Sequence, residues 1–147
     1  MDKQDNLAIL TFDGVNLLLP QANVVTIEMS TTFDQRANSN GALGNLSMGN
    51  LEWPVYALDA NFRPLDRCPE EYRYCVAVSI NGAEAFSLAC EEVGAILVES
   101  EDEINPLQDC MKTPTNPIES LLFKDDRLML LSNVNSMANY LSLEAAA

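Results

Sequence analysis

Histidine is absent from the 147-residue chain, which removes the side chain most often used as a general base and a common zinc ligand. The four cysteines follow no Cys-x-x-Cys spacing; they are Cys68, Cys75, Cys90 and Cys110. We therefore expect reduced thiols and no metal site. With no imidazole to activate a serine or cysteine nucleophile, we also expect a protein that is not an enzyme and needs no cofactor.

Basic residues are scarce as well, because eight lysines and arginines face 22 acidic residues and leave a formal net charge of −14. Such a charge repels phosphate backbones and anionic lipid headgroups, so nucleic acid and membrane surfaces are disfavoured as partners. Long hydrophobic runs are missing, and every apolar segment is shorter than the about 18 residues that cross a bilayer. The polar start MDKQDN precedes no hydrophobic segment of a secretory signal, which predicts a cytoplasmic location.

Short apolar segments separated by turn residues are what the chain does contain, and they predict mainly β-structure. The expected strands span residues 7–12, 15–19, 24–29, 52–58, 73–80, 85–90, 93–99, 118–123 and 127–131. Asp13-Gly14 and Asn81-Gly82 are typical of tight hairpin turns, so each predicts a hairpin between its flanking strands. Residues 93–99 are expected to extend the second hairpin as a meander. Pro54 lacks an N–H group, which favours an edge strand, a strand start or a bulge.

Polar or proline-rich stretches predict the connections. Residues 31–44 are rich in Asn, Ser and Gly and should form a loop, and residues 61–71 should join two halves of the molecule. Residues 104–117 hold three prolines, too many for a regular element. Residues 133–143 should form a closing helix behind an Asn or Ser cap. Its apolar positions at helical spacing are Val134, Met137, Ala138 and Leu141. The pattern predicts a barrel or a sandwich, without a βαβ crossover.

The order of these segments resembles the CheW-like domain of bacterial chemotaxis and twitching-motility signalling, along nearly the whole chain. The matching pieces are VVTIEM at 24–29, Gly44 with PVYALD ten residues later, FSLACEEVGAIL at 86–97, INPL at 104–107 and DDRLMLLSNVNSM at 125–137. Their shared order and spacing carry the resemblance. It implies one CheW-like domain over residues 1–147, mainly β, in which two small five-stranded β-barrel lobes are interleaved and packed together, with a C-terminal helix.

The resemblance also implies a function, that of a non-enzymatic adaptor or scaffold coupling a chemosensory histidine kinase to receptors or other adaptors in chemotaxis or surface motility. The implied partners are proteins: the regulatory domain of the kinase, a chemoreceptor tip or another CheW-like adaptor. The partner-binding residues that it implies are Val24, Thr26, Ile27, Gly44, Ser47, Met48, Gly49 and Asn50.

Departures from the family pattern fall in the second of these segments. Gly49 stands where the family has an arginine near its kinase and receptor surfaces, Asn50 stands at the following glycine, and Ser47 at an asparagine. A further family glycine is Ser87 here. The chain therefore resembles a divergent member, in which coupling through that arginine is not expected to carry over. The stretch from Gly44 is expected to begin as a polar loop, and Gly44 and Gly49 are expected to supply the backbone angles that bend it.

Plainer interpretations stay open for the same residues. A Val-Ile pair such as Val24 and Ile27 is also typical of barrel core, and a polar loop can serve only to connect strands. Trp53, just before a strand proline, favours a core position over a docking anchor. Two other function classes remain: a β-barrel that binds a small ligand in an apolar interior, and a hydrolase using carboxylates such as Asp59 and Glu91.

Overall fold

The computed structural model describes residues 5–30, 43–48, 51–65, 67–80, 83–98, 104–106, 117–124 and 126–146. Its strands are β1 (Asp5–Phe12), β2 (Val15–Pro20), β3 (Val24–Met29), β4 (Gly44–Met48), β5 (Leu51–Tyr56), β6 (Tyr74–Ile80), β7 (Ala83–Cys90), β8 (Glu92–Val98), β9 (Ile104–Pro106), β10 (Ser120–Lys124) and β11 (Arg127–Leu131). A 3₁₀ turn, η1 (Gln21–Asn23), follows β2, and the helix α1 (Val134–Ala146) follows β11. The predicted mainly β fold class with a C-terminal helix is confirmed.

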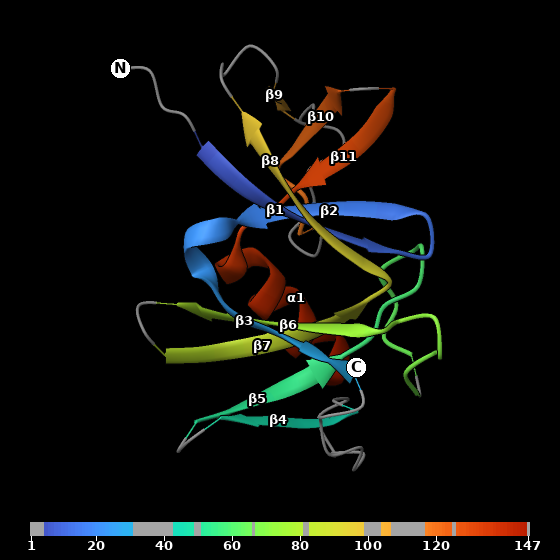
Figure 1. Ribbon diagram of the computed structural model, residues 1–147, viewed down its shortest axis with the longest axis vertical. Coiled ribbons are helices and arrows are strands. Elements are labelled where there is room, and N and C mark those ends of the chain that lie inside the picture. Colours follow the sequence, from blue (N-terminus) through green and yellow to red (C-terminus); the bar gives the residue numbers. More distant parts are fainter. Residues whose placement is uncertain are drawn as a thin grey trace.

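The strands form two sheets, which Figure 1 shows as upper and lower halves of the molecule with α1 beside their junction. The six-stranded sheet has the order β8-β1-β2-β11-β10-β9, in which the three-residue β9 occupies an edge. The five-stranded sheet has the order β3-β6-β7-β5-β4. The chain therefore leaves the first sheet after β2, builds the whole second sheet, and returns at β8. The strands of the six-stranded sheet therefore come from two separate parts of the sequence, before and after the five-stranded sheet.

The hairpins predicted from turn residues are present in the structure. Asp13 and Gly14 both have positive φ, 47° and 81°, the backbone twist that lets a two-residue turn join β1 to β2. Glycine adopts this angle without strain, and Asp is among the few other residues that tolerate it. The predicted pairs β6–β7 and β10–β11 are also antiparallel neighbours. The turn residues Asn81 and Gly82 lie outside the described part of the chain.

The structure departs from the sequence-based expectations for three strands. β8 does not extend the β6–β7 meander, because it crosses to the other sheet and pairs with β1. β5, which contains Pro54, is not an edge strand and lies between β4 and β7. Its parallel pairing with β7 is recorded from Val55 onward, beyond the position of the missing N–H. A short strand, β9, also forms within 104–117, where no element was expected; residues 107–116 lie outside the described ranges.

The core explains why several strands read as continuous apolar runs instead of alternating ones. In β1 and β2, alternate residues face opposite layers, and both layers are buried. One layer, a small cluster within the six-stranded sheet, consists of Leu7, Ile9, Leu18, Leu122 and Met129. The other contains Leu10, Phe12, Leu17 and Leu19 and continues into the five-stranded sheet and α1. One shared core thus fixes the two sheets together.

Two polar contacts anchor this core. Trp53 is buried, and its indole Nε1–H donates to the carbonyl oxygen of Val78 at 3.0 Å, so its predicted core position is confirmed. At the start of α1, Asn133 Oδ1 accepts the Ser136 N–H at 2.7 Å, which is the expected asparagine cap. Val134, Met137 and Leu141 are buried along one face of the helix.

Candidate partner-binding surfaces

The first candidate surface is one face of β3, an edge strand of the five-stranded sheet. Val25, Ile27 and Met29 alternate along this strand and are 45%, 48% and 50% exposed, whereas Thr26 and Glu28 between them are half-buried. This is the reverse of the usual arrangement, in which the apolar face of a strand is buried and the polar face is solvated. The Thr26 hydroxyl donates to Glu28 Oε1 at 3.1 Å, so the polar face is internally bonded. We call Val25, Ile27 and Met29 the β3 face.

The second candidate surface lies at the end of the β10–β11 hairpin in the other sheet. Phe123 and Leu128 are directly opposite each other across the two strands and are 64% and 52% exposed. Leu121 and Leu130, the next pair on the same side, are half-buried against the main core. The exposed pair therefore continues a core layer out to solvent. We call Phe123 and Leu128 the hairpin tip.

Hydrogen bonds hold the hairpin tip against the rest of its sheet. Arg127 Nη2 donates to Asn16 Oδ1 at 2.6 Å, and Asn16 Nδ2 donates to the carbonyl oxygen of Leu128 at 3.4 Å. Asn16 lies on β2, the strand that pairs in parallel with β11. In Figure 1 the β10–β11 hairpin lies in the upper half of the molecule and β3 crosses the lower half. Each of the two sheets thus carries an exposed group of neighbouring apolar side chains.

The residues singled out from sequence are divided between two places. Val24, Thr26 and Ile27 lie on β3, and only Ile27 of these is exposed. Gly44, Ser47 and Met48 lie on β4, the opposite edge strand, with three strands between. The two segments therefore do not form one continuous surface on the sheet. Gly49 and Asn50, including the position of the family arginine, lie outside the described residues.

The interpretation of the segment from Gly44 as a loop was wrong, because Gly44–Met48 is a strand paired antiparallel with β5. Gly44 is buried and extended; among the described residues, Gly14 is the glycine with a left-handed φ. Its role in bending the chain is therefore not supported. Ser47 is exposed, and its hydroxyl donates to Glu52 Oε1 across the hairpin at 3.4 Å.

The sequence reasoning missed Val25, Met29, Phe123 and Leu128. Their exposure leaves no mark in the sequence, because a strand with apolar residues at alternate positions has the same pattern whether that face meets the core or a partner. The one available signal was the pair Thr26 and Glu28, which marks a second, polar face of the same strand.

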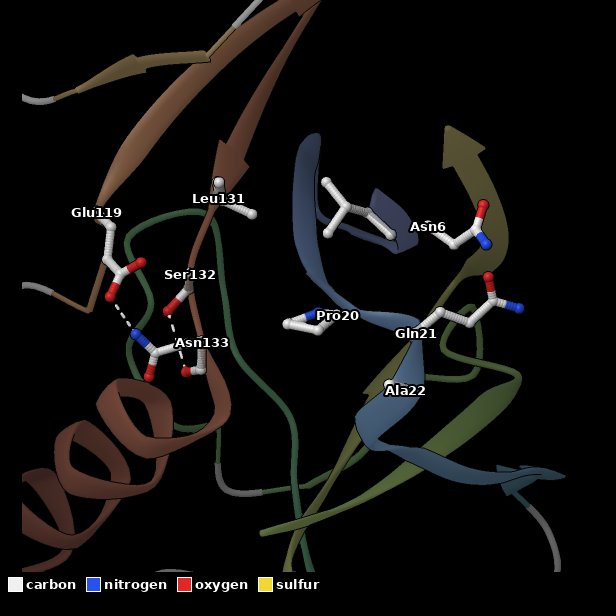
Figure 2. Close-up of a pocket in the computed structure, with 9 residues that line it drawn as sticks. Asn6, Pro20, Gln21, Ala22, Glu119, Leu131, Ser132 and Asn133 are labelled. Atoms are coloured by element: carbon white, nitrogen blue, oxygen red, sulfur yellow. Dashed lines mark hydrogen bonds between the residues drawn. The ribbon is translucent and has the colours of Figure 1, made fainter. Parts of the chain in front are cut away.

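A cavity with a volume of about 660 Å³ lies between η1 and the end of β11 (Figure 2). Asn6, Gln21 and Ala22 border one side. On the other side, Asn133 Nδ2 donates to Glu119 Oε1, and the Ser132 hydroxyl donates to the carbonyl oxygens of Pro117 and Asn133. These polar groups therefore already have partners within the chain.

The surroundings of the described thiols and of Asp59 indicate structural roles. Burial raises the pKa of Cys75 and of Cys90 to about 12, so both remain protonated at neutral pH. Burial also raises the pKa of Cys68, whereas Cys110 lies outside the described residues. Asp59 Oδ1 accepts the N–H groups of Asn61 and Arg63 at 2.8 and 3.0 Å and so holds a turn. In the described part of the chain, no group of three His, Cys, Asp or Glu side chains can hold a metal ion.

Comparisons with known proteins bear on the fold. No protein-family model matches the chain, and no curated protein matches it. Among solved structures, the scaffolding protein TtCheW from Thermoanaerobacter tengcongensis superposes with a TM-score of 0.66 over 88% of this chain and 89% of that chain, at 16% sequence identity. Within the residues that the structure describes, no helix has the length and apolar character needed to cross a membrane. The chain has a CheW-like fold, with a sequence far diverged from that of the solved scaffold.

Proposed function

We propose that this protein is an adaptor that binds two protein partners at once, one on the β3 face and one on the hairpin tip. The observation that carries the proposal is the presence of two exposed apolar surfaces on two sheets that share one core. Large apolar side chains exposed as neighbours are typical of protein–protein contact sites. Because the shared core fixes the two sheets to each other, binding at both surfaces sets the relative orientation of the partners.

The CheW-like fold supports the choice of pathway. The matching structure is a scaffolding protein, and an adaptor of that architecture fits a chemosensory complex in the cytoplasm. The proposed partners are the regulatory domain of a histidine kinase and either a chemoreceptor tip or another CheW-like adaptor, in chemotaxis or surface motility. The net charge of −14 favours protein partners with neutral or basic contact surfaces. Neither surface needs a reactive group for this task.

Calorimetric titration of the full chain with a kinase regulatory-domain fragment and, separately, with a receptor-tip fragment tests the proposal. Ile27→Ser should weaken binding of one fragment at least tenfold and leave the other unchanged, and Phe123→Ser should do the opposite. Asn135→Ser, an exposed polar position on α1, is the matched control and should change neither affinity. Binding of neither fragment by the unaltered chain would contradict the proposal.

Gly49→Arg tests the departure from the family pattern. If the chain is a coupler weakened by the lack of that arginine, the substitution should strengthen kinase binding. Unchanged binding would show that this chain does not use that position. A thermal-shift screen of metabolites tests the alternative function, a β-barrel that binds a small ligand. Such a protein is stabilised by its ligand without any protein fragment.

A further inference from the structure

Beside the β3 face lie two small cavities that share residues. One, of about 400 Å³, is lined by Ile27, Tyr74, Glu92 and Val93. The other, of about 450 Å³, is lined by Tyr74, Glu92 and three more residues, Glu71, Arg73 and Glu91. Ile27 belongs to both the β3 face and the first cavity, and Met29 pairs with Tyr74 across β3 and β6. The apolar strand face therefore continues into a hollow whose far side is acidic.

The charges of this hollow are unbalanced. Among the lining residues, Glu71, Glu91 and Glu92 carry negative charge and Arg73 is the single cation. None of these glutamates forms an ion pair with another described residue. Acidic side chains on their own would be ordinary solvated charges. Here they adjoin walls of Ile27, Tyr74 and Val93, which are apolar or aromatic and half-buried to half-exposed.

A lysine or arginine side chain has the matching construction, an apolar stem that ends in a cation. Its stem can lie along Ile27 and Val93, and its charged end can reach Glu92 and Glu91. The ring of Tyr74 adds an attractive surface for a cation. An acidic side chain in the same hollow would meet at least three like charges. A second copy of this chain, itself at −14, is a poor occupant for the same reason.

The edge strand β3, next to the hollow, favours a partner segment in an extended conformation. No strand of the described sheet lies beyond β3, so an extended segment can add along this edge with its alternate side chains on the β3 face. Building on the β3 docking surface of the proposed function, we infer that the partner contributes an extended segment with alternating apolar residues and one lysine or arginine, whose cationic end enters the hollow between Tyr74 and Glu92.

Fluorescence anisotropy with three labelled peptides tests this inference on the full chain. The first peptide is Thr-Val-Thr-Val-Thr-Lys-Thr; the second replaces lysine with norleucine, which keeps an apolar stem without the charge, and the third replaces it with glutamate. At low salt, the lysine peptide should bind about three- to tenfold more tightly than the norleucine peptide, and the glutamate peptide should bind most weakly. Added salt should reduce the difference.

Two protein variants test whether Glu92 is responsible for the preference for the lysine peptide. Glu92→Lys should remove or invert the preference for lysine, whereas Glu52→Lys, at another exposed glutamate, on β5, should leave it unchanged. Equal affinity for the lysine and norleucine peptides would overturn the cation site while leaving docking on β3 intact. Failure of all three peptides would overturn the inference, and the kinase and receptor titrations would still judge the proposed function. A dimer in sedimentation that Ile27→Ser dissolves would instead identify a second copy as the occupant.

Discussion

Ser87→Ala should stabilise the protein, although it removes a polar group from the middle of a strand. Ser87 lies on β7 between Val55 and Ala77, and its side chain is fully buried. Its hydroxyl oxygen has no hydrogen-bond partner among the residues that the structure describes. Burying an unsatisfied hydroxyl costs about 1–3 kcal/mol, so removing it should stabilise the folded chain. The small cavity left by the lost oxygen destabilises the chain and offsets part of that gain. We expect a net gain of about 1 kcal/mol in the free energy of unfolding.

Ser132→Ala is the matched control, because Ser132 is also buried but its hydroxyl donates to the carbonyl oxygen of Pro117 at 2.5 Å. Removing that donor should cost about 1 kcal/mol. Urea unfolding of the two variants and the unaltered chain measures both changes in the free energy of unfolding. In thermal unfolding, each kcal/mol should move the melting temperature by about 2–4 °C. Loss of stability in Ser87→Ala equal to that in Ser132→Ala would refute the reasoning, since the bonded and unbonded hydroxyls would then be equivalent.

Three further outcomes are expected for the fold. Trp53→Phe should lower the free energy of unfolding by about 2 kcal/mol in urea titrations, because it leaves the buried Val78 carbonyl without its donor; a change under 0.5 kcal/mol would contradict this. Asn133→Ala should cost about 1 kcal/mol by removing the cap of α1, and unchanged stability would argue against that cap. The raised pKa values of Cys75 and Cys90, about 12 against an ordinary 9.0, mean that their contribution to stability is complete below pH 9 and is lost as pH rises toward 12. Urea unfolding from pH 8 to 11 should show this decline, and Cys90→Ala should make it shallower; an identical slope in the variant would exclude the thiol as a cause.

The features predicted correctly from sequence are those set by nearby residues. Asp13-Gly14 fixes the β1–β2 hairpin because these two residues tolerate the required φ angles. Asn133 predicts the start of α1 because its side chain can reach an N–H group three residues on. The resemblance to the CheW-like domain rests on the order of such segments, and the structural match confirms the fold that it implied.

The errors concern pairings between segments far apart in the chain. The sequence of β8 is compatible with pairing to β7 or to β1, and only the packing of the two sheets selects β1. Pro54 favoured an edge strand, a strand start or a bulge because it lacks an N–H group. β5 lies between β4 and β7, and its pairing with β7 begins at Val55, just after the proline. The segment from Gly44 looked like a loop, yet its pairing with β5 supplies backbone hydrogen bonds that its composition does not reveal.

The candidate surfaces were predictable only in part. The resemblance directed attention to residues 24–27, and β3 does carry an exposed apolar face. The exposed residues of that face are Val25, Ile27 and Met29. Of these, only Ile27 was among the residues that the resemblance implied. Apolar side chains at alternate positions give the same pattern for a core and for a contact surface, so exposure must come from the structure.

Native mass spectrometry of the full chain mixed with both the kinase regulatory-domain fragment and the receptor-tip fragment tests the central claim most directly. We expect a three-component complex with one copy of each protein. Ile27→Ser should reduce it to a complex with one fragment, and Phe123→Ser should reduce it to a complex with the other. Competition between the two fragments for the chain, with no three-component species, would contradict an adaptor built on two separate surfaces.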